Sequence, residues 1–427
     1  MSSNPSPRLE LSSKPQLRGF WAMWAMIGLL GFGGPAGQIA LMHRELIERR
    51  RWLSERQFVR ALNFCMLLPG PEAQQLAIYC GWLLHGKRGG LIAGSLFVLP
   101  GACLMGVVSI IYVYHRDLPW MGWMFDGLKS AVMAIVAAAL WQLGKKILRR
   151  RIDWLLAMFA LVALAYLELP FPLLILVVMA AGFLMAPRGN GACPTVDESA
   201  ARSGLHDEAS LKSSIMQAAV WMGLCLLPPV LCLLVLGKSH LLSVCSWFFT
   251  KAAALAFGGA YAVLSYVSQQ AVNGHGWITA DQMMDGLGLA ETTPGPLVLV
   301  LQFIGFLCAW NFPGDGSPWL IAACGGLLAS WAIFLPGFLY VFAAAPWYER
   351  YSKLPRLEQM IRFVSAAIVG VIANLALCFC LNVVVGDGGA VDLLPLLPSL
   401  VFLLLLRSEK CSPAVVVGLG AVYGLIQ

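Results

Sequence analysis

The sequence predicts an all-α polytopic membrane protein made of two inverted-topology repeats, each with broken or re-entrant helices. The first reason is composition: 59% of the 427 residues are hydrophobic, only 12% are charged, and the mean hydropathy is +0.75. Soluble proteins are about half apolar and about a quarter charged. The second reason is that the chain matches itself at a constant offset. The third is that basic residues surround only one copy of this match.

Apolar runs set the expected membrane spans. A bilayer core about 30 Å thick needs roughly 20 apolar residues per crossing helix. Residues 91–114, 215–236 and 364–385 are runs of this kind. Further apolar segments that we expect to cross lie at 154–185, 321–344, 393–406 and 414–426. Residues 1–17 lack the apolar segment and small-residue cleavage site of a signal peptide, so we expect a short polar tail.

An internal repeat covers residues 32–71, which match residues 257–296 without a gap at an offset of 225. The identical positions are mostly glycine, proline and aromatic residues: Phe32, Gly33, Gly34, Trp52, Gln57, Leu62, Pro69, Gly70 and Pro71 recur as Phe257, Gly258, Gly259, Trp277, Gln282, Leu287, Pro294, Gly295 and Pro296. We therefore expect a first repeat at 18–186 and a second at 215–427. A linker rich in Gly, Ser and acidic residues joins them at 187–214.

Basic residues orient the two copies. Six arginines lie within residues 43–60 of the first copy, whereas residues 252–349 contain no Lys or Arg. The positive-inside rule then places the first loop, the N-terminus and the linker in the cytoplasm and the second copy of the loop on the far side. Basic residues also lie before the first apolar run at Arg18, after it at 44–60, and after the Pro-Gly-Pro run at 87–88. All three points are then cytoplasmic, which predicts two re-entrant hairpins that turn at the glycine stretch and at Pro-Gly-Pro. A single straight span over 19–42 is the rival topology, and it violates the charge rule once.

The Pro-Gly-Pro breaks predict an anion site. A helix break at membrane depth survives only where protein or a wet cavity surrounds it. Pro71 and Pro296 suit the first position of a helix, which leaves the amides of residues 72–74 and 297–299 unpaired. Two such helix N-termini, facing each other, would form a positive site. Gly33, Gly34, Gly258 and Gly259 would let the neighbouring chain approach closely. The alternative is that these residues only kink packed helices.

Polar side chains close to the breaks are candidate ligands for the anion. Asn63, Gln74 and Gln75 belong to the first repeat, and Thr292 and Thr293 to the second. Each of them could instead satisfy nearby backbone groups. Lys251 would offset the charge of the substrate, or alternatively extend to the membrane interface.

Two carboxylates flank the breaks asymmetrically. Glu72 follows the first Pro-Gly-Pro directly, and Glu291 precedes the second by three residues. Carboxylates repel a dianion unless they are protonated or paired with a cation such as Lys251. We therefore expect one of them to carry protons, so that proton entry and anion exit are coupled. Glu72 has an alternative role as a favourable negative charge at a helix N-terminus.

The segments that carry these breaks resemble a known family. The stretches "GFGGPAGQIALMHREL", "RRWLSERQF" and "LLPGPEAQQLAIYCGWLLHG" in residues 31–86, with "FFTKAAALAFGGAYAVLSYV" and "GLGLAETTPGP" in the second half, resemble the chromate ion transporter family of the long, two-domain type. The resemblance implies export of chromate across the bacterial inner membrane and chromate resistance, with sulfate as the look-alike anion. From the breaks and the polar groups beside them, we expect the substrate-binding residues to be Gly33, Gly34, Asn63, Pro69, Gly70, Pro71, Gln74, Gln75, Lys251, Gly258, Gly259, Thr292, Thr293, Pro294, Gly295 and Pro296.

Other function classes fit less well. The closest rival is a passive sulfate or oxyanion channel, or an anion exchanger. The chain has no His-Glu-x-x-His pair and no nucleophile with a histidine partner, which argues against an enzyme. Most of the 12 cysteines lie in apolar runs without metal-ligand spacing, so we expect no metal and no cofactor. The net charge of +7 marks cytoplasmic loops rather than nucleic-acid binding. The expected partners are the anion and the lipid bilayer, and a homodimer is left open.

Overall fold

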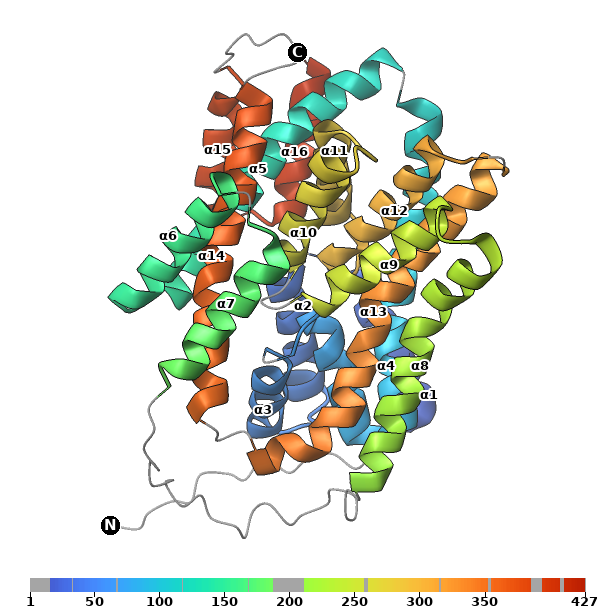
Figure 1. Ribbon diagram of the computed structural model, residues 1–427, viewed down its shortest axis with the longest axis vertical. Helices are drawn as coiled ribbons and strands as arrows, with labels where there is room; N and C mark the ends of the chain where they lie inside the picture. The colour runs from blue at the N-terminus through green and yellow to red at the C-terminus, as the bar shows by residue number, and fades with distance from the viewer. Residues whose placement is uncertain are drawn as a thin grey trace.

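The computed structural model describes most of the chain, and all of its regular structure is helical (Figure 1). The described residues are 16–32, 34–66, 68–116, 118–167, 169–186, 211–256, 260–314, 316–351, 355–384, 394–407 and 411–426. Within them, the helices long and apolar enough to cross a membrane are Glu72–His115, Pro119–Ile147, Ser214–Leu236, Pro318–Ala345 and Gln359–Leu381. The prediction of an all-α polytopic membrane protein is confirmed.

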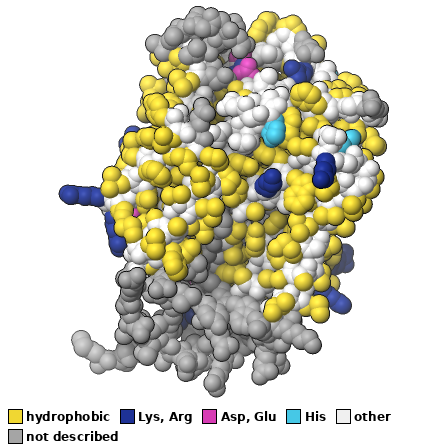
Figure 2. All heavy atoms as spheres, in the orientation of Figure 1, with side chains coloured by type: hydrophobic (Ala, Val, Ile, Leu, Met, Phe, Trp, Pro, Cys, Tyr) yellow, Lys and Arg dark blue, Asp and Glu magenta, His cyan; other side chains and the backbone are white. Residues whose placement is uncertain are grey.

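The surface has the apolar character that a lipid-facing surface needs. Figure 2 shows hydrophobic side chains over much of one face, with only scattered charged groups between them. Large apolar side chains are widely exposed, including Leu155 at 69%, Leu176 at 63% and Leu234 at 77%. Soluble monomers rarely expose apolar patches of this extent, whereas hydrocarbon solvates them without cost.

The first half of the chain begins with two helical hairpins, at the positions where the sequence predicts re-entrant ones. They consist of α1 (Leu17–Leu30), α2 (Gly34–His43), the π-helical η1 (Arg44–Arg49), α3 (Glu55–Cys65) and the first part of α4 (Glu72–His115). Phe20, near the start of α1, has its ring centroid 6.4 Å from that of Trp52, before α3, and 4.7 Å from that of His85 in α4. The chain therefore enters and returns twice to one end, and residues 19–42 do not form one straight span.

Helix α4 changes direction at Gly86, which has a φ of +61°. Glycine adopts this left-handed backbone conformation without the steric cost of a Cβ. The segment before this point completes the second hairpin, and residues 87–115 form a long helix of about 43 Å at roughly 1.5 Å per residue. Gly81 and Gly89 face each other across the reversal, where a Cβ on Gly81 would lie 2.4 Å from the Gly89 carbonyl oxygen.

The second repeat builds the same arrangement. Its elements are α9 (Leu241–Ala254), α10 (Ala260–Ser268), the π-helical η3 (Gln269–Gly274), α11 (Ala280–Thr292), the 3₁₀ turn η4 (Leu297–Leu299) and α12 (Val300–Asn311). Trp277, before α11, lies 5.3 Å from the ring of Phe248 in α9, and its carbonyl accepts a 2.9 Å hydrogen bond from Asn311 Nδ2. These hairpins also return to a common end.

Local geometry agrees with the 225-residue offset even where residue identity is low. Ser54 and Gln57 form a capping box at the start of α3, and Thr279 and Gln282 form the same box at the start of α11. Both π-helical segments occupy equivalent positions, 44–49 and 269–274. The central glycines of the two Pro-Gly-Pro motifs have left-handed φ angles, +116° at Gly70 and +102° at Gly295.

The two pairs of hairpins start from opposite ends of the long part of α4. The first pair returns near His85, at the beginning of that segment. At its other end, the ring of Tyr114 stacks on Trp319 at 4.8 Å, and Trp319 lies 4.5 Å from Trp310 near the end of α12. Figure 1 accordingly shows α3 in the lower part of the molecule and α11 in the upper part. The predicted inversion requires this placement, and the orientation in the membrane stays a prediction.

The outer helices exchange between the two halves. They are α5 (Pro119–Ile147), α6 (Arg151–Ala165), α7 (Phe171–Leu184), α8 (Leu211–Leu236), α13 (Pro318–Tyr351), α14 (Pro355–Val384), α15 (Leu396–Arg407) and α16 (Pro413–Ile426). Helices α6 and α7 of the first half pack on α14 of the second, whereas α15 and α16 pack on α5. Small residues allow the close approach: a Cβ on Gly127 of α5 would lie 2.0 Å from the Gly420 carbonyl oxygen.

The predicted linker lies mainly outside the described residues. Helix α8 begins at Leu211, so residues 211–214 are helical rather than part of a linker. Helix α8 precedes the second pair of hairpins and packs on α9 and α13. The polar tail likewise falls outside the described residues as far as residue 15, and α1 begins at Leu17.

Candidate functional site: a cavity where the broken helices meet

The helix breaks of the two repeats are joined directly through their backbones. The amide of Gly70 donates a 2.8 Å hydrogen bond to the carbonyl of Ala256, and the amide of Gly295 donates one of 3.0 Å to the carbonyl of Gly31. Gly31 and Ala256 are related by the same offset of 225 as Gly70 and Gly295. The Pro-Gly-Pro tip of each repeat therefore contacts the glycine break of the other, as a local two-fold relation requires.

Two buried glutamines hold these breaks in place. The side-chain amide of Gln38 donates to the Gly31 carbonyl at 3.0 Å and also to the carbonyl of Gly295. Gln75 donates to the Pro69 carbonyl at 2.6 Å. Both residues are 0% exposed. Their counterparts in the second repeat are Val263 and Val300, so this support comes from the first repeat alone.

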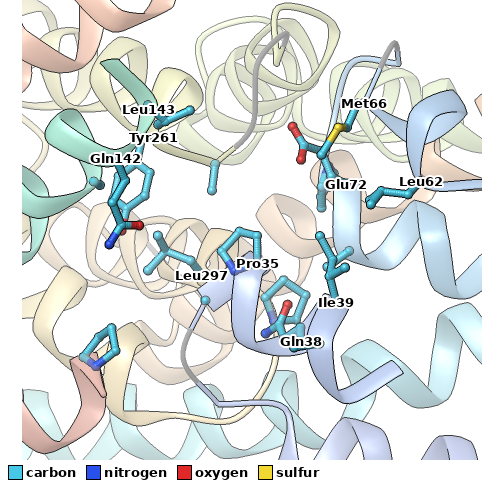
Figure 3. Close-up of a pocket in the computed structure, with 18 of the residues that line it drawn as sticks. Pro35, Gln38, Ile39, Leu62, Met66, Glu72, Gln142, Leu143, Tyr261 and Leu297 are labelled. Atoms are coloured by element: carbon cyan, nitrogen blue, oxygen red, sulfur yellow. The ribbon is translucent and has the colours of Figure 1, made fainter. Parts of the chain in front are cut away.

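A cavity of about 740 Å³ lies beside the joined breaks (Figure 3). Both tips line it, through Pro71, Glu72 and Ala73 of the first repeat and Pro296, Leu297 and Val298 of the second. Figure 3 shows Glu72 on one side of the cavity, Tyr261 and Gln142 on the other, and Pro35 and Leu297 between them. The site thus draws residues from the hairpins of both halves and from α5.

Free amide groups of the first tip lie at the start of α4. The first intrahelical hydrogen bond there joins the Gln75 amide to the Pro71 carbonyl at 3.0 Å. The amides of residues 72–74 precede this bond, which leaves them as donors without a partner inside the helix, as the sequence predicted.

The second tip differs from its sequence-based prediction. Its chain continues as the 3₁₀ turn η4, in which the Leu299 amide donates to the Pro296 carbonyl at 2.9 Å. The expectation that the amides of 297–299 are all free is therefore wrong for Leu299, because the tighter turn closes its bond one residue earlier. Leu297 and Val298 remain as the lining residues whose amides precede that bond.

Charged and titratable side chains line the cavity near the two tips. Glu291 is 5% exposed and accepts a 3.1 Å hydrogen bond from the Tyr261 hydroxyl. Glu72 is half-buried and lines the cavity at the first tip. Lys146 is exposed at the end of α5 and is the basic residue of the described lining.

One histidine and two exposed glutamates lie at the solvent-exposed side of the cavity. His43 contacts Glu55 Oε2 through Nε2 at 2.8 Å and Glu48 Oε1 through Nδ1 at 3.2 Å. All three residues line the cavity, and the two glutamates are exposed to solvent. They belong to η1, α3 and the end of α2, so the cavity opens toward the end of the molecule that carries the arginine-rich loop.

Several residues predicted from the sequence lie at this site. Gly34, Pro71, Glu72, Glu291 and Pro296 line the cavity. Pro69, Gly70, Pro294 and Gly295 form the tips behind it, and Gln75 supports the first tip. Gly33, Gly258 and Gly259 lie outside the described residues.

Other predicted ligands point elsewhere. Asn63 is exposed on α3 and is absent from the lining, and Lys251 is exposed on α9 and is also absent from it. Thr292 and Thr293 donate to carbonyls of their own helix, at 2.8 Å to Leu289 and 3.2 Å to Ala290. The backbone alternative therefore describes both threonines.

Gln74 also leaves the site. It donates to the Phe334 carbonyl of α13 at 3.1 Å and lines a second cavity of about 620 Å³ between α4, α12 and α13. A helix N-terminus turns successive side chains by about 100°, so neighbouring glutamines at 74 and 75 face different partners.

Sequence reasoning missed several polar lining residues, among them Gln38, Gln142, Lys146 and Tyr261. Gln38 and Tyr261 follow the two glycine breaks within a few residues, a position that could have marked them. Gln142 and Lys146 carry no such signal, because α5 reaches the site only through tertiary packing. Within the described residues, no group of three or more His, Cys, Asp or Glu side chains could hold a metal ion.

Comparison with known proteins identifies the family of the chain. A family model described as "Chromate transporter" matches residues 18–184 and 244–425. The chain belongs to the chromate transporter family. Each matched range contains one pair of helical hairpins and one Pro-Gly-Pro tip, and each contributes residues to the cavity.

Individual chromate transporter relatives are similar over most of their length. The chain is 31% identical to the chromate transport protein of Cupriavidus metallidurans over 405 residues, which cover 94% of this chain and 90% of that protein. It is 30% identical over 350 residues to a probable chromate transport protein of Synechococcus elongatus, covering 82% and 80% of the two chains. No solved structure matches the chain.

Proposed function

We propose that this protein is a secondary transporter that exports chromate across the bacterial inner membrane and thereby confers chromate resistance. One observation carries the proposal: helix N-termini from two opposed pairs of hairpins line a single cavity. Names of relatives that are chromate transport proteins support the choice of anion.

The cavity suits a tetrahedral dianion on electrostatic grounds. A helix N-terminus carries about half a positive charge together with backbone donors. The unpaired amides at the start of α4, those of Leu297 and Val298, and the ammonium of Lys146 are the groups that we expect to supply positive potential to the cavity. A cage of backbone donors accepts chromate and sulfate alike, because the two ions share shape and charge.

The carboxyl groups at the site favour coupling to protons. Glu291 is buried beside Tyr261, and Glu72 lies at the other edge of the cavity. An ionised carboxylate repels a nearby dianion and weakens its binding, whereas a protonated carboxyl group does not. We propose that protonation of Glu72 and Glu291 changes during the cycle and links anion export to proton movement.

The proposed orientation follows from charge. Arginines of the first loop lie where the cavity opens, and the positive-inside rule assigns that end to the cytoplasm. The structure would then correspond to a state open to the cytoplasm, with the second pair of hairpins entering from the outside. An inverted pair of repeats of this kind is a frequent design of secondary transporters.

Inside-out membrane vesicles test the proposal, because their outer surface is the cytoplasmic face. We expect such vesicles to take up chromate, and an imposed pH difference across the vesicle membrane to change the accumulated amount. A passive oxyanion channel would only equalise chromate across the membrane, and an enzyme would transform chromate without accumulating it. Absence of chromate uptake, with the protein present and folded, would rule the transporter out.

Three variants assign the roles. Glu72→Gln and Glu291→Gln remove the titratable groups at the cavity, so we expect uptake to lose its response to pH. Lys251→Met serves as the matched control, since Lys251 is exposed outside the lining. A normal pH response in both glutamine variants would show that other groups carry the protons.

A further inference from the structure

Equivalent helices of the two repeats have different surroundings. Helix α3 presents Val59, which is 42% exposed, to the cavity, whereas its counterpart Met284 in α11 is 1% exposed. Arg60 on α3 is exposed, and its counterpart Asp285 is 6% exposed. Because the helices occupy matching positions in the repeats, this difference describes the conformation: the path is open beside α3 and closed beside α11.

Two side-chain contacts fasten α11 at the closed end. The Tyr112 hydroxyl of α4 donates a 2.8 Å hydrogen bond to Asp285 Oδ2. Lys129 of α5 pairs with Asp281 Oδ1 at 3.1 Å and with Asp126 of its own helix at 2.9 Å. Together these contacts connect α11 to α4 and to α5 at this end of the molecule.

Helix packing follows the same asymmetry. Helix α11 packs along α5 and α16. In the repeat, α5 corresponds to α14 and α16 corresponds to α7. Within the described residues, α3 has no comparable packing on α14 or α7. The cavity occupies the space beside α3, where α5, α15 and the first tip line it.

We propose that Tyr112, Asp285, Lys129 and Asp281 form the gate that closes the far end of the transport path. Transport then requires α11 to separate from α5 at this gate while α3 closes over its own side of the cavity. This inference rests on the proposed transport function. In inverted-repeat transporters each state is related to the other by exchange of the two repeats' conformations. The packed arrangement of α11 therefore shows the arrangement that α3 adopts in the second state.

A disulfide across the gate tests the movement. A Cβ on Gly288 of α11 would lie 3.8 Å from the Leu128 Cβ of α5. This matches the Cβ separation of about 3.8 Å in disulfides. We expect the double variant Leu128→Cys, Gly288→Cys to lose chromate uptake on oxidation and to regain it on reduction. Wild type and the single variant Leu128→Cys, treated with the same oxidant, control for the native cysteines.

Mass spectrometry of peptides first verifies that the disulfide between residues 128 and 288 has formed. Full uptake by the oxidised, cross-linked double variant would overturn the gate, while uptake by wild type would still support chromate transport. Absence of uptake by wild type would instead count against the proposed function. The gate is then judged by a second measurement that does not depend on chromate.

Labelling of Gly288→Cys from the far side provides this second measurement. In right-side-out vesicles, a membrane-impermeant maleimide should react slowly, because residue 288 is buried against Leu128. Adding Tyr112→Phe removes the hydrogen bond to Asp285, and we expect the labelling rate to rise roughly fivefold. Tyr114→Phe, two residues along the same helix on a side chain that is 65% exposed, is the matched control. An unchanged rate with Tyr112→Phe would contradict the gate.

Discussion

Glu291 is a buried carboxyl group that lines the cavity and accepts a hydrogen bond from the hydroxyl of Tyr261. Its 5% exposure and its hydrogen bond from Tyr261 distinguish it from Glu72, which is half-buried at a helix N-terminus. A negative charge at a helix N-terminus is stabilised by the local dipole, and α11 offers Glu291 no such N-terminus because the residue lies in its last turn. Of the two, Glu291 is therefore the stronger candidate for a group that cycles between charged and neutral forms.

Binding of the dianion should consequently weaken as pH rises. Sulfate is the suitable probe, because it stays a dianion over the working range. In its ionised form Glu291 repels the ligand, so we expect affinity to be highest at low pH and to fall as the carboxyl group loses its proton. Glu291→Gln should keep the low-pH affinity throughout, as measured by calorimetry of purified protein. Equal pH dependence in wild type and variant would exclude this role for Glu291.

Gln38 should matter for stability rather than for ligand chemistry. Replacement by Leu leaves the carbonyls of Gly31 and Gly295 without the donor that they share, at a cost of about 1–3 kcal/mol. We expect Gln38→Leu to lower the unfolding temperature of the detergent-solubilised protein. Gln142→Leu is the control, since Gln142 lines the same cavity with an exposed side chain. Equal losses in the two variants would show that Gln38 does not hold the breaks together.

At the level of helices, close approach of backbones positions the tips. Gly101 lies in the long part of α4, where a Cβ would stand 2.2 Å from the Pro294 carbonyl oxygen. Backbone atoms cannot move aside as a flexible side chain can. Gly101 therefore allows α4 to pass directly behind the second tip.

Gly101→Ala should displace that tip. Overpacking of this kind costs about 1–3 kcal/mol, and we expect both the unfolding temperature and chromate uptake to fall. Gly122→Ala is the control, because a Cβ on Gly122 of α5 would meet nothing within 4 Å. If Gly101→Ala matched Gly122→Ala in both measurements, the tip would not depend on the packing of α4.

The helix breaks could be predicted from sequence because their causes are local. Pro-Gly-Pro ends one helix and begins another whatever surrounds it, and the repeated motif fixes equivalent positions in both halves. The directions of Gln74, Lys251 and Asn63 could not be predicted in this way. Gln74 bonds to Phe334, 260 residues away, and the helices that expose Lys251 and Asn63 are placed by partners from other parts of the chain.

Over the whole molecule, the exchange of outer helices interlocks the two halves. Helices α6 and α7 pack on α14, α15 and α16 pack on α5, and Arg362 of α14 pairs with the buried Asp153 of α6 at 2.6 Å. Neither half can complete its own packing, because each needs surfaces supplied by the other. The sequence repeat predicted two similar halves, but similarity alone does not indicate which half covers which.

Separate expression of the halves tests the interlocking. We expect residues 1–200 and 201–427, expressed together as two chains, to assemble and restore chromate uptake, whereas either chain alone should be degraded. The measurement is the level of each chain in membranes together with uptake by inside-out vesicles. Stable, folded accumulation of one half alone would contradict the interlocked arrangement.

The most direct test of the account is to locate the bound anion. Chromium scatters X-rays anomalously, so a crystal structure of the protein with chromate can show the position of the anion. The account predicts chromate in the 740 Å³ cavity, within hydrogen-bond distance of backbone amides in residues 72–74 and of Leu297 or Val298. Chromate bound away from both Pro-Gly-Pro tips, for example at Lys251, would contradict it.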